Sequence, residues 1–220
     1  MSIHFTKPTV IIIAAVTCFC VMFETGCSTK EDRANKLIKE RMSKTLYDYE
    51  SYDPIETTVK EAKASLYTDT ACWGMGTVLY QCMKKALEYS KKADEAKEHM
   101  EIWGPPTYYS SSYSDSKYRK YKSEYEDANT SFLASMLLSK TVSDTLKEMV
   151  SNLDETTIIG WEVIHKFRCK TKGGYATIGN YRFVMDKGFN QILLEEDLDS
   201  EESQEKRVTI EKLLDDSYWN

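Results

Sequence analysis

Two long runs of apolar and small residues with helical spacing constrain the fold of this 220-residue chain most strongly. In the first run such residues recur every three or four positions, at Met75, Leu79, Cys82, Ala86, Tyr89, Ala93, Ala96, Met100 and Trp103. In the second they stand at Tyr118, Tyr121, Tyr125, Ala128, Phe132, Ser135, Ser139, Val142, Leu146 and Met149. Alternating steps of three and four keep one helix face against a partner helix. The spacing therefore predicts two long helices with a coiled-coil seam.

The residues between the two runs predict a reversal of the chain. Gly104-Pro105-Pro106 ends the first helix, and Ser114-Asp115 offers an N-cap for the second. In an antiparallel arrangement small residues face large ones, namely Ala93 and Ala96 against Tyr121 and Tyr125. Residues 72–150 are thus expected to form a helical hairpin. At ~1.5 Å per residue its first helix is about 43 Å long, more than the width of a small domain, so the hairpin should project.

The segments on either side of the hairpin follow other patterns. Residues 33–47 carry one apolar helical face, and residues 55–59 alternate as a short strand. After the hairpin, alternating segments predict a three-stranded antiparallel meander, at residues 161–169, 181–185 and 192–194.

The expected fold class is therefore α+β. A small helix-plus-antiparallel-meander domain, made of residues 33–71 and 151–194, carries the long inserted antiparallel helical hairpin. Residues 195–220 are expected to form an acidic C-terminal segment with a short helix.

The N-terminal residues are typical of an export signal. Lys7 precedes an unbroken apolar run from Val10 to Phe23, which is shorter than a bilayer crossing requires, and Thr25-Gly26 then precede Cys27. This layout resembles a bacterial lipoprotein signal. The resemblance implies that residues 1–26 are a signal peptide and that Cys27 carries a fatty-acyl (palmitate-type) anchor. Glu24 departs from the usual aliphatic residue three places before the cysteine, and an uncleaved N-terminal anchor is the alternative.

Residues 27–32 are expected to be a lipid-anchored tether. Within it, Lys30-Glu31-Asp32 resembles the signal that takes some Bacteroidetes lipoproteins to the outer face of the outer membrane. An ordinary solvated tether is the alternative. The protein is expected in the cell envelope, at the outer membrane. Both its surface face and its periplasmic face are retained as alternatives.

Charge and cysteine content restrict the classes of partner. The net charge is -6, whereas binding to nucleic acid requires clustered Lys and Arg, so nucleic acid is not an expected partner. Besides Cys27, the mature chain holds Cys72, Cys82 and Cys169. This odd number permits at most one disulfide with a thiol left over.

Two motifs flanking the hairpin carry a second resemblance. Ser51-Tyr52-Asp53-Pro54-Ile55 follows the first helix, and a strand with His165-Lys166-Phe167-Arg168 leads to Gly173-Gly174-Tyr175. This combination resembles a group of uncharacterised exported lipoproteins of Bacteroidetes, although Cys169 stands where alanine is usual. The resemblance implies the fold and the compartment, and it implies no activity.

Catalysis is not expected. His99 falls on the solvated side of the first hairpin helix, and His165 shares a strand face with Val163 and Phe167, as a satisfied core histidine would. His165 and Cys169 stand about 13 Å apart along one strand, too far for a nucleophile–base pair. Metal-ligand spacings and phosphate-binding glycine loops are missing from the sequence, so no metal and no cofactor is expected. A hydrolase acting through unrecognised residues is the weakest alternative.

The hairpin tip is the candidate binding site. Residues 105–114 are rich in Tyr and Ser, a mixture that antibody loops use for recognition, and its tyrosines are Tyr108, Tyr109 and Tyr113. The alternative is a plain connector whose tyrosines pack on Trp103 and Tyr118. We therefore expect a lipid-anchored, non-catalytic envelope protein that presents this tip to a partner or glycan. The alternative function is a structural or assembly subunit that docks through the hairpin or the meander edge.

Overall fold

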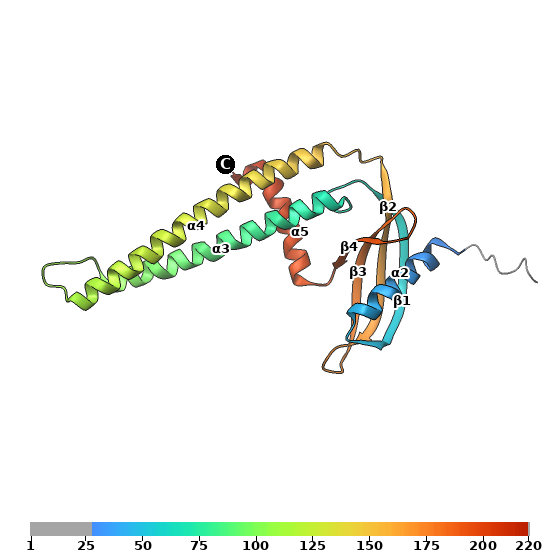
Figure 1. The fold of residues 1–220 in the computed structure, drawn as a ribbon, viewed down its shortest axis with the longest axis horizontal. Helices are drawn as coiled ribbons and strands as arrows, with labels where there is room; N and C mark the ends of the chain where they lie inside the picture. Colours follow the sequence, from blue (N-terminus) through green and yellow to red (C-terminus); the bar gives the residue numbers. More distant parts are fainter. Residues whose placement is uncertain (1–27, 220) are drawn as a thin grey trace, which may run out of the picture.

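The fold is that of a computed structural model, which describes residues 28–219 (Figure 1). In chain order its elements are α2 (Lys30–Thr45), β1 (Asp48–Lys63), α3 (Thr70–Trp103), α4 (Ser112–Ser151), β2 (Ile158–Lys170), β3 (Ala176–Asp186), β4 (Ile192–Asp197), α5 (Glu201–Leu214) and the 3-10 turn η1 (Asp216–Trp219). The helices and the antiparallel sheet confirm the α+β class.

The sheet is a four-stranded meander in the order β1-β2-β3-β4, with each neighbouring pair antiparallel. The three predicted strands are present, and β1 adds a fourth at the edge. This strand spans sixteen residues, although the sequence pattern predicted only residues 55–59. Irregular pairing with β2 explains the difference, because register shifts between Asp48 and Asp53 and between Pro54 and Glu56 break the alternation of apolar and polar residues.

One face of the sheet packs against α2 and forms the first core. Its buried members are Ala34, Ile38, Met42, Val163, Phe167, Cys169, Phe183, Met185 and Phe189. The helix begins at Lys30, within the segment 27–32 that was expected to be a tether. A capping box sets this start: the Thr29 hydroxyl accepts from the Asp32 amide at 3.1 Å, and the Asp32 carboxylate accepts from the Thr29 amide at 3.0 Å.

The helices α3 and α4 form the predicted antiparallel hairpin. At ~1.5 Å per residue α3 is about 51 Å long. It ends at Gly104, whose φ of 63° is a left-handed conformation that favours glycine. The second helix begins earlier than Ser114-Asp115, because Ser111 is the N-cap and accepts from the Ser114 amide at 3.1 Å.

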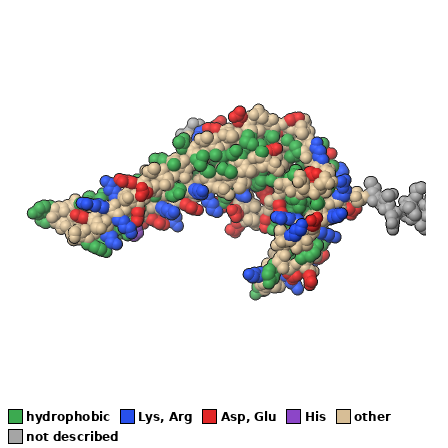
Figure 2. Space-filling model, viewed as in Figure 1, with side chains coloured by type: hydrophobic (Ala, Val, Ile, Leu, Met, Phe, Trp, Pro, Cys, Tyr) green, Lys and Arg blue, Asp and Glu red, His purple; other side chains and the backbone are tan. Residues whose placement is uncertain are grey.

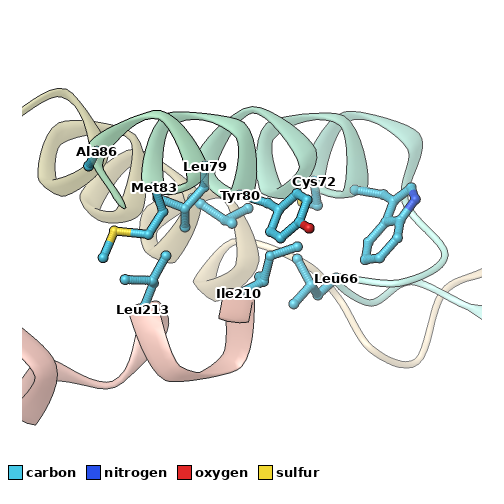
Figure 3. Packing of buried hydrophobic residues seen from close by; sticks show 10 residues of the cluster. Leu66, Cys72, Leu79, Tyr80, Met83, Ala86, Ile210 and Leu213 are labelled. Atoms are coloured by element: carbon cyan, nitrogen blue, oxygen red, sulfur yellow. The ribbon is translucent and has the colours of Figure 1, made fainter. Parts of the chain in front are cut away.

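A second core lies where α5 crosses the base of the hairpin (Figure 3). It buries Leu66, Cys72, Trp73, Leu79, Tyr80, Met83, Ala86, Leu146, Ile210 and Leu213. Here α3 buries a second side of the helix in addition to the predicted seam. This second side includes Tyr80 and Met83. The C-terminal segment predicted at 195–220 is therefore divided: residues 195–197 belong to β4, and α5 completes this core.

The hairpin projects from one end of the sheet, and its tip lies at the opposite end of the long axis from the start of α2 (Figure 1). Over residues 28–219 no helix combines the length and the apolar character needed to span a bilayer.

Candidate functional site

The hairpin tip is an ordered turn with strongly exposed tyrosines. The Ser110 hydroxyl donates to the Thr107 carbonyl at 2.8 Å, and the Ser110 amide donates to the same oxygen at 3.2 Å. Tyr108 is 94% exposed and Tyr109 92%. Their rings pack edge to face with centroids 5.2 Å apart, so the two side chains stand as a pair in solvent. Figure 2 shows hydrophobic side chains gathered at this free end of the hairpin.

Tyr113 differs from the other two tip tyrosines. Its ring packs edge-on against Trp103, with centroids 5.5 Å apart, although it remains 61% exposed. The alternative interpretation, a plain connector whose tyrosines pack on Trp103 and Tyr118, therefore applies in part to Tyr113. It does not describe Tyr108 and Tyr109, which have no ring contact with Trp103 or Tyr118.

His165 is completely buried and both of its ring nitrogens are hydrogen bonded. Tyr52 Oη lies 2.7 Å from Nε2, and Thr57 Oγ1 lies 2.8 Å from Nδ1. The Thr57 hydroxyl donates to Asn35 Oδ1 at 2.7 Å, so it accepts from Nδ1–H of the imidazole. Nε2 consequently accepts from the Tyr52 hydroxyl. This directed chain of hydrogen bonds agrees with the expectation of a satisfied core histidine.

Burial also shifts the pKa values of His165 and Tyr52 away from neutral pH. It lowers the pKa of His165 to about 4 and, together with Tyr49, raises the pKa of Tyr52 to about 12. Both groups are therefore neutral at pH 7. The imidazole is held in a fixed, solvent-excluded position.

The three cysteines in the described chain are free and buried, so the one disulfide that their number would permit does not form there. Burial, with a smaller contribution from Asp69, raises the pKa of Cys72 to about 11. Burial, followed by Asp48, also raises the pKa of Cys169. Thiols held protonated in this way are poor nucleophiles.

The motif residues that carry the resemblance to exported lipoproteins meet in space. The Tyr52 ring lies 5.3 Å from that of Phe167, in addition to its bond with His165. Ser51 Oγ accepts from the Lys170 amide at 2.8 Å, where β1 departs from regular pairing. These residues attach the edge strand to β2 and the core, so a structural role accounts for this part of the motif.

His99 lies on the hairpin surface and stacks on Tyr121, with ring centroids 4.5 Å apart and planes 20° apart. Both rings border a groove of about 470 Å³ between α3 and α4, whose floor includes the small side chains of Ala96 and Ala128. Among residues 28–219 no group of three or more His, Cys, Asp or Glu side chains is placed to hold a metal ion.

A buried charge network that the sequence analysis missed joins the two cores. Glu196 accepts from Arg182 Nε at 3.0 Å and from Arg207 Nε at 2.7 Å. Arg182 also donates to the Tyr67 carbonyl at 2.8 Å and lies 3.6 Å from Glu162. Burial opposes ionisation of Glu196, but the two arginines outweigh it and lower its pKa. The available signal was an arginine within the apolar strand 181–185.

The residues of the expected export signal have structural contacts. Lys30 Nζ lies 3.8 Å from the centre of the Trp161 ring, and Asp32 completes the capping box of α2. Glu31 lies exposed in the first turn. The expected lipidation site, Cys27, lies outside the described residues.

An uncharged, leucine-rich face of α4 is exposed in the middle of the hairpin. No Asp, Glu, Lys or Arg occurs in residues 128–139. Three leucines there are more than half exposed, namely Leu133, Leu137 and Leu138. Exposed apolar residues that cluster in this way are typical of interaction surfaces.

No family model, curated protein or solved structure matches this chain.

Proposed function

We propose that the protein is a lipid-anchored component of the cell envelope that binds a partner, without catalysis, through the tip of its helical hairpin. Cys27 would hold the chain at the outer membrane, and the hairpin would present Tyr108 and Tyr109 to a protein or glycan. The resemblance of the N-terminal residues to a lipoprotein signal supports the anchor.

The exposure of the tyrosine pair carries the proposal. Two large rings that are more than 90% exposed stand on a hydrogen-bonded turn at the end of a helix about 51 Å long. Tyrosine provides a rigid contact surface with few rotatable bonds, so little entropy is lost when it is immobilised in a complex. The tip also lies at the opposite end of the long axis from α2, the element that follows the proposed anchor (Figure 1).

Substitution of the tyrosine pair tests the proposal. The double variant Tyr108→Ser/Tyr109→Ser removes both rings, and Tyr47→Ser/Tyr175→Ser is the matched control, because Tyr47 is 73% exposed and Tyr175 77% exposed outside the hairpin. The probes are an array of immobilised glycans and mass-spectrometric crosslinking on intact cells. Retention or crosslinks that the wild type and control share and the tip variant loses would support the proposal. Equal behaviour of all three chains would refute it.

The leucine-rich face of α4 favours a second candidate, a subunit that assembles through the hairpin. A Leu133→Lys/Leu137→Lys variant should then abolish assembly in envelope extracts, while the Tyr108→Ser/Tyr109→Ser variant should leave it intact. Docking through the β1 edge of the sheet has less support, because Pro54 and three register shifts against β2 make this strand irregular.

A further inference from the structure

The charge of α2 is opposite in sign to that of the whole chain. The helix holds six basic residues, Lys30, Arg33, Lys36, Lys39, Arg41 and Lys44, against three acidic ones, Glu31, Asp32 and Glu40. It therefore carries a formal charge of +3 in a chain whose net charge is -6. Basic residues therefore outnumber acidic ones two to one in this first element of the described structure.

The inner and outer faces of α2 have separate roles. Ala34, Ile38 and Met42 are buried against the sheet, so the opposite side of the helix faces solvent. Lys36 and Lys39 lie exposed there, and neither makes a hydrogen bond or an ion pair within the described part of the chain. Lys36 does interact with Glu40, because after Lys44 it contributes to lowering the pKa of that carboxyl. Other α2 bases are engaged: Arg41 pairs with Glu195 at 2.6 Å, and Lys44 with Glu40 at 2.8 Å. Two ammonium groups thus remain available for an external anion.

The position of α2 relative to the proposed anchor indicates which anion this is. Lys30 follows Cys27 by three residues, and at up to ~3.6 Å per residue it lies within about 11 Å of the lipid-bearing residue. That distance is close to the Debye length of ~8 Å at physiological salt, so the start of the helix feels the potential of a charged membrane surface. Basic segments beside a membrane anchor are attracted to anionic headgroups.

We infer that α2 docks its outer face, through Lys36 and Lys39, onto the anionic headgroups of the membrane that holds the anchor. This inference rests on the lipid anchor of the proposed function and is independent of the ligand at the tip. Docking adds an electrostatic contact to the acyl chain and holds the sheet against the lipid surface. The hairpin tip lies at the other end of the long axis from α2 (Figure 1).

Lysine footprinting of the reconstituted protein tests the docking. The full chain, extracted from membranes in detergent, is placed in vesicles of phosphatidylcholine alone or with phosphatidylglycerol, and exposed amines are acetylated and quantified by mass spectrometry. Acetylation of Lys36 and Lys39 is expected to fall about threefold or more in the anionic vesicles. Labelling of Lys85 and Lys97, exposed on α3, should be the same in both vesicles. Salt at about 0.5 M should restore labelling of the α2 lysines.

Charge-reversed variants provide the matched control. Each basic group near an anionic surface favours contact about fivefold. Lys44 is also exposed on α2, so its acetylation should fall in the anionic vesicles in the same salt-sensitive way. Lys36→Glu/Lys39→Glu should abolish this protection of Lys44, and Lys85→Glu/Lys97→Glu, with the same change in net charge, should keep it.

Two results would overturn the inference in distinguishable ways. Equal labelling of Lys36 and Lys39 in both vesicles, on a chain whose N-terminal peptide carries the acyl mass, would refute the docking alone. An N-terminal peptide without that mass would overturn the anchor and the docking that rests on it. Neither result depends on the tip tyrosines.

Discussion

Acidification from pH 7 to pH 4.5 is expected to destabilise the sheet core through His165. Burial lowers the pKa of this imidazole from 6.5 to about 4, so between these values the unfolded chain binds a proton that the folded chain does not. Stability is therefore fully present above pH 6.5 and is lost as the pH falls toward 4. Integrating the linkage relation from pH 7 to pH 4.5 gives a loss of about 2.5 kcal/mol.

The hydrogen-bond directions give the structural reason for this loss. Nε2 accepts from the Tyr52 hydroxyl, and Nδ1–H already donates to Thr57. A proton on Nε2 would face the hydroxyl hydrogen of Tyr52 across a heavy-atom distance of 2.7 Å. The hydroxyl would have to turn away, and the imidazolium would remain in a site that excludes water.

Urea unfolding followed by circular dichroism measures this effect at several pH values in the window. The non-titrating variant His165→Gln is the control, because carboxyl groups contribute equally to both chains. The wild type should lose about 2.5 kcal/mol more than the variant between pH 7 and pH 4.5. Parallel losses in the two chains, or an NMR titration of His165 with a midpoint near 6.5, would refute the reasoning.

Two further predictions concern stability. Glu196→Gln should lower the free energy of unfolding by about 3 kcal/mol, because the buried Arg182 and the partly buried Arg207 lose their carboxylate partner. In thermal unfolding, Glu40→Gln at the exposed pair with Lys44 should leave the midpoint unchanged, and equal midpoints for both variants would contradict this prediction. Gly160→Ala should destabilise the sheet by about 3 kcal/mol, because a Cβ there would lie 2.0 Å from the Met185 carbonyl oxygen. Gly74→Ala should instead stabilise α3 by about 1 kcal/mol, because a Cβ at that position would have no atom within 4 Å. Urea midpoints that move in the same direction for both alanine variants would contradict the second prediction.

The local patterns predicted the elements that bury one regular face. The hairpin seam was readable because a small or apolar residue at every third or fourth position has few explanations other than a helix that contacts a partner. The same pattern left the second side of α3 unnoticed, since Tyr80 and Met83 are buried by α5, which lies more than 100 residues further along the chain. A residue that is buried only by a distant segment of the chain leaves no periodic pattern in the sequence around it.

Polar core residues show the same limit more clearly. Glu196 is the second residue of the acidic stretch that begins at Glu195, so the composition around it indicated solvent exposure. Only the arginines of β3 and α5 make its burial tolerable. His165 could be assigned to the core from its strand neighbours. Its partners Tyr52 and Thr57 could not be assigned, because they lie 113 and 108 residues away on an irregular edge strand.

The charge network ties the sheet to α5 and to Tyr67, which lies at the base of the projecting hairpin. A rotation of about 5° at its base would move a tip about 50 Å away by about 4 Å, more than a specific contact tolerates. Apolar packing between α5 and the hairpin is favourable but not directional. The two-pronged contact of Arg207 with Glu196 fixes an angle as well as a distance, and Arg182 ties the same carboxylate to the sheet and to the Tyr67 carbonyl. A partner bound at the tip would therefore be held at a set position relative to the sheet, and hence to the membrane surface on which α2 is proposed to lie.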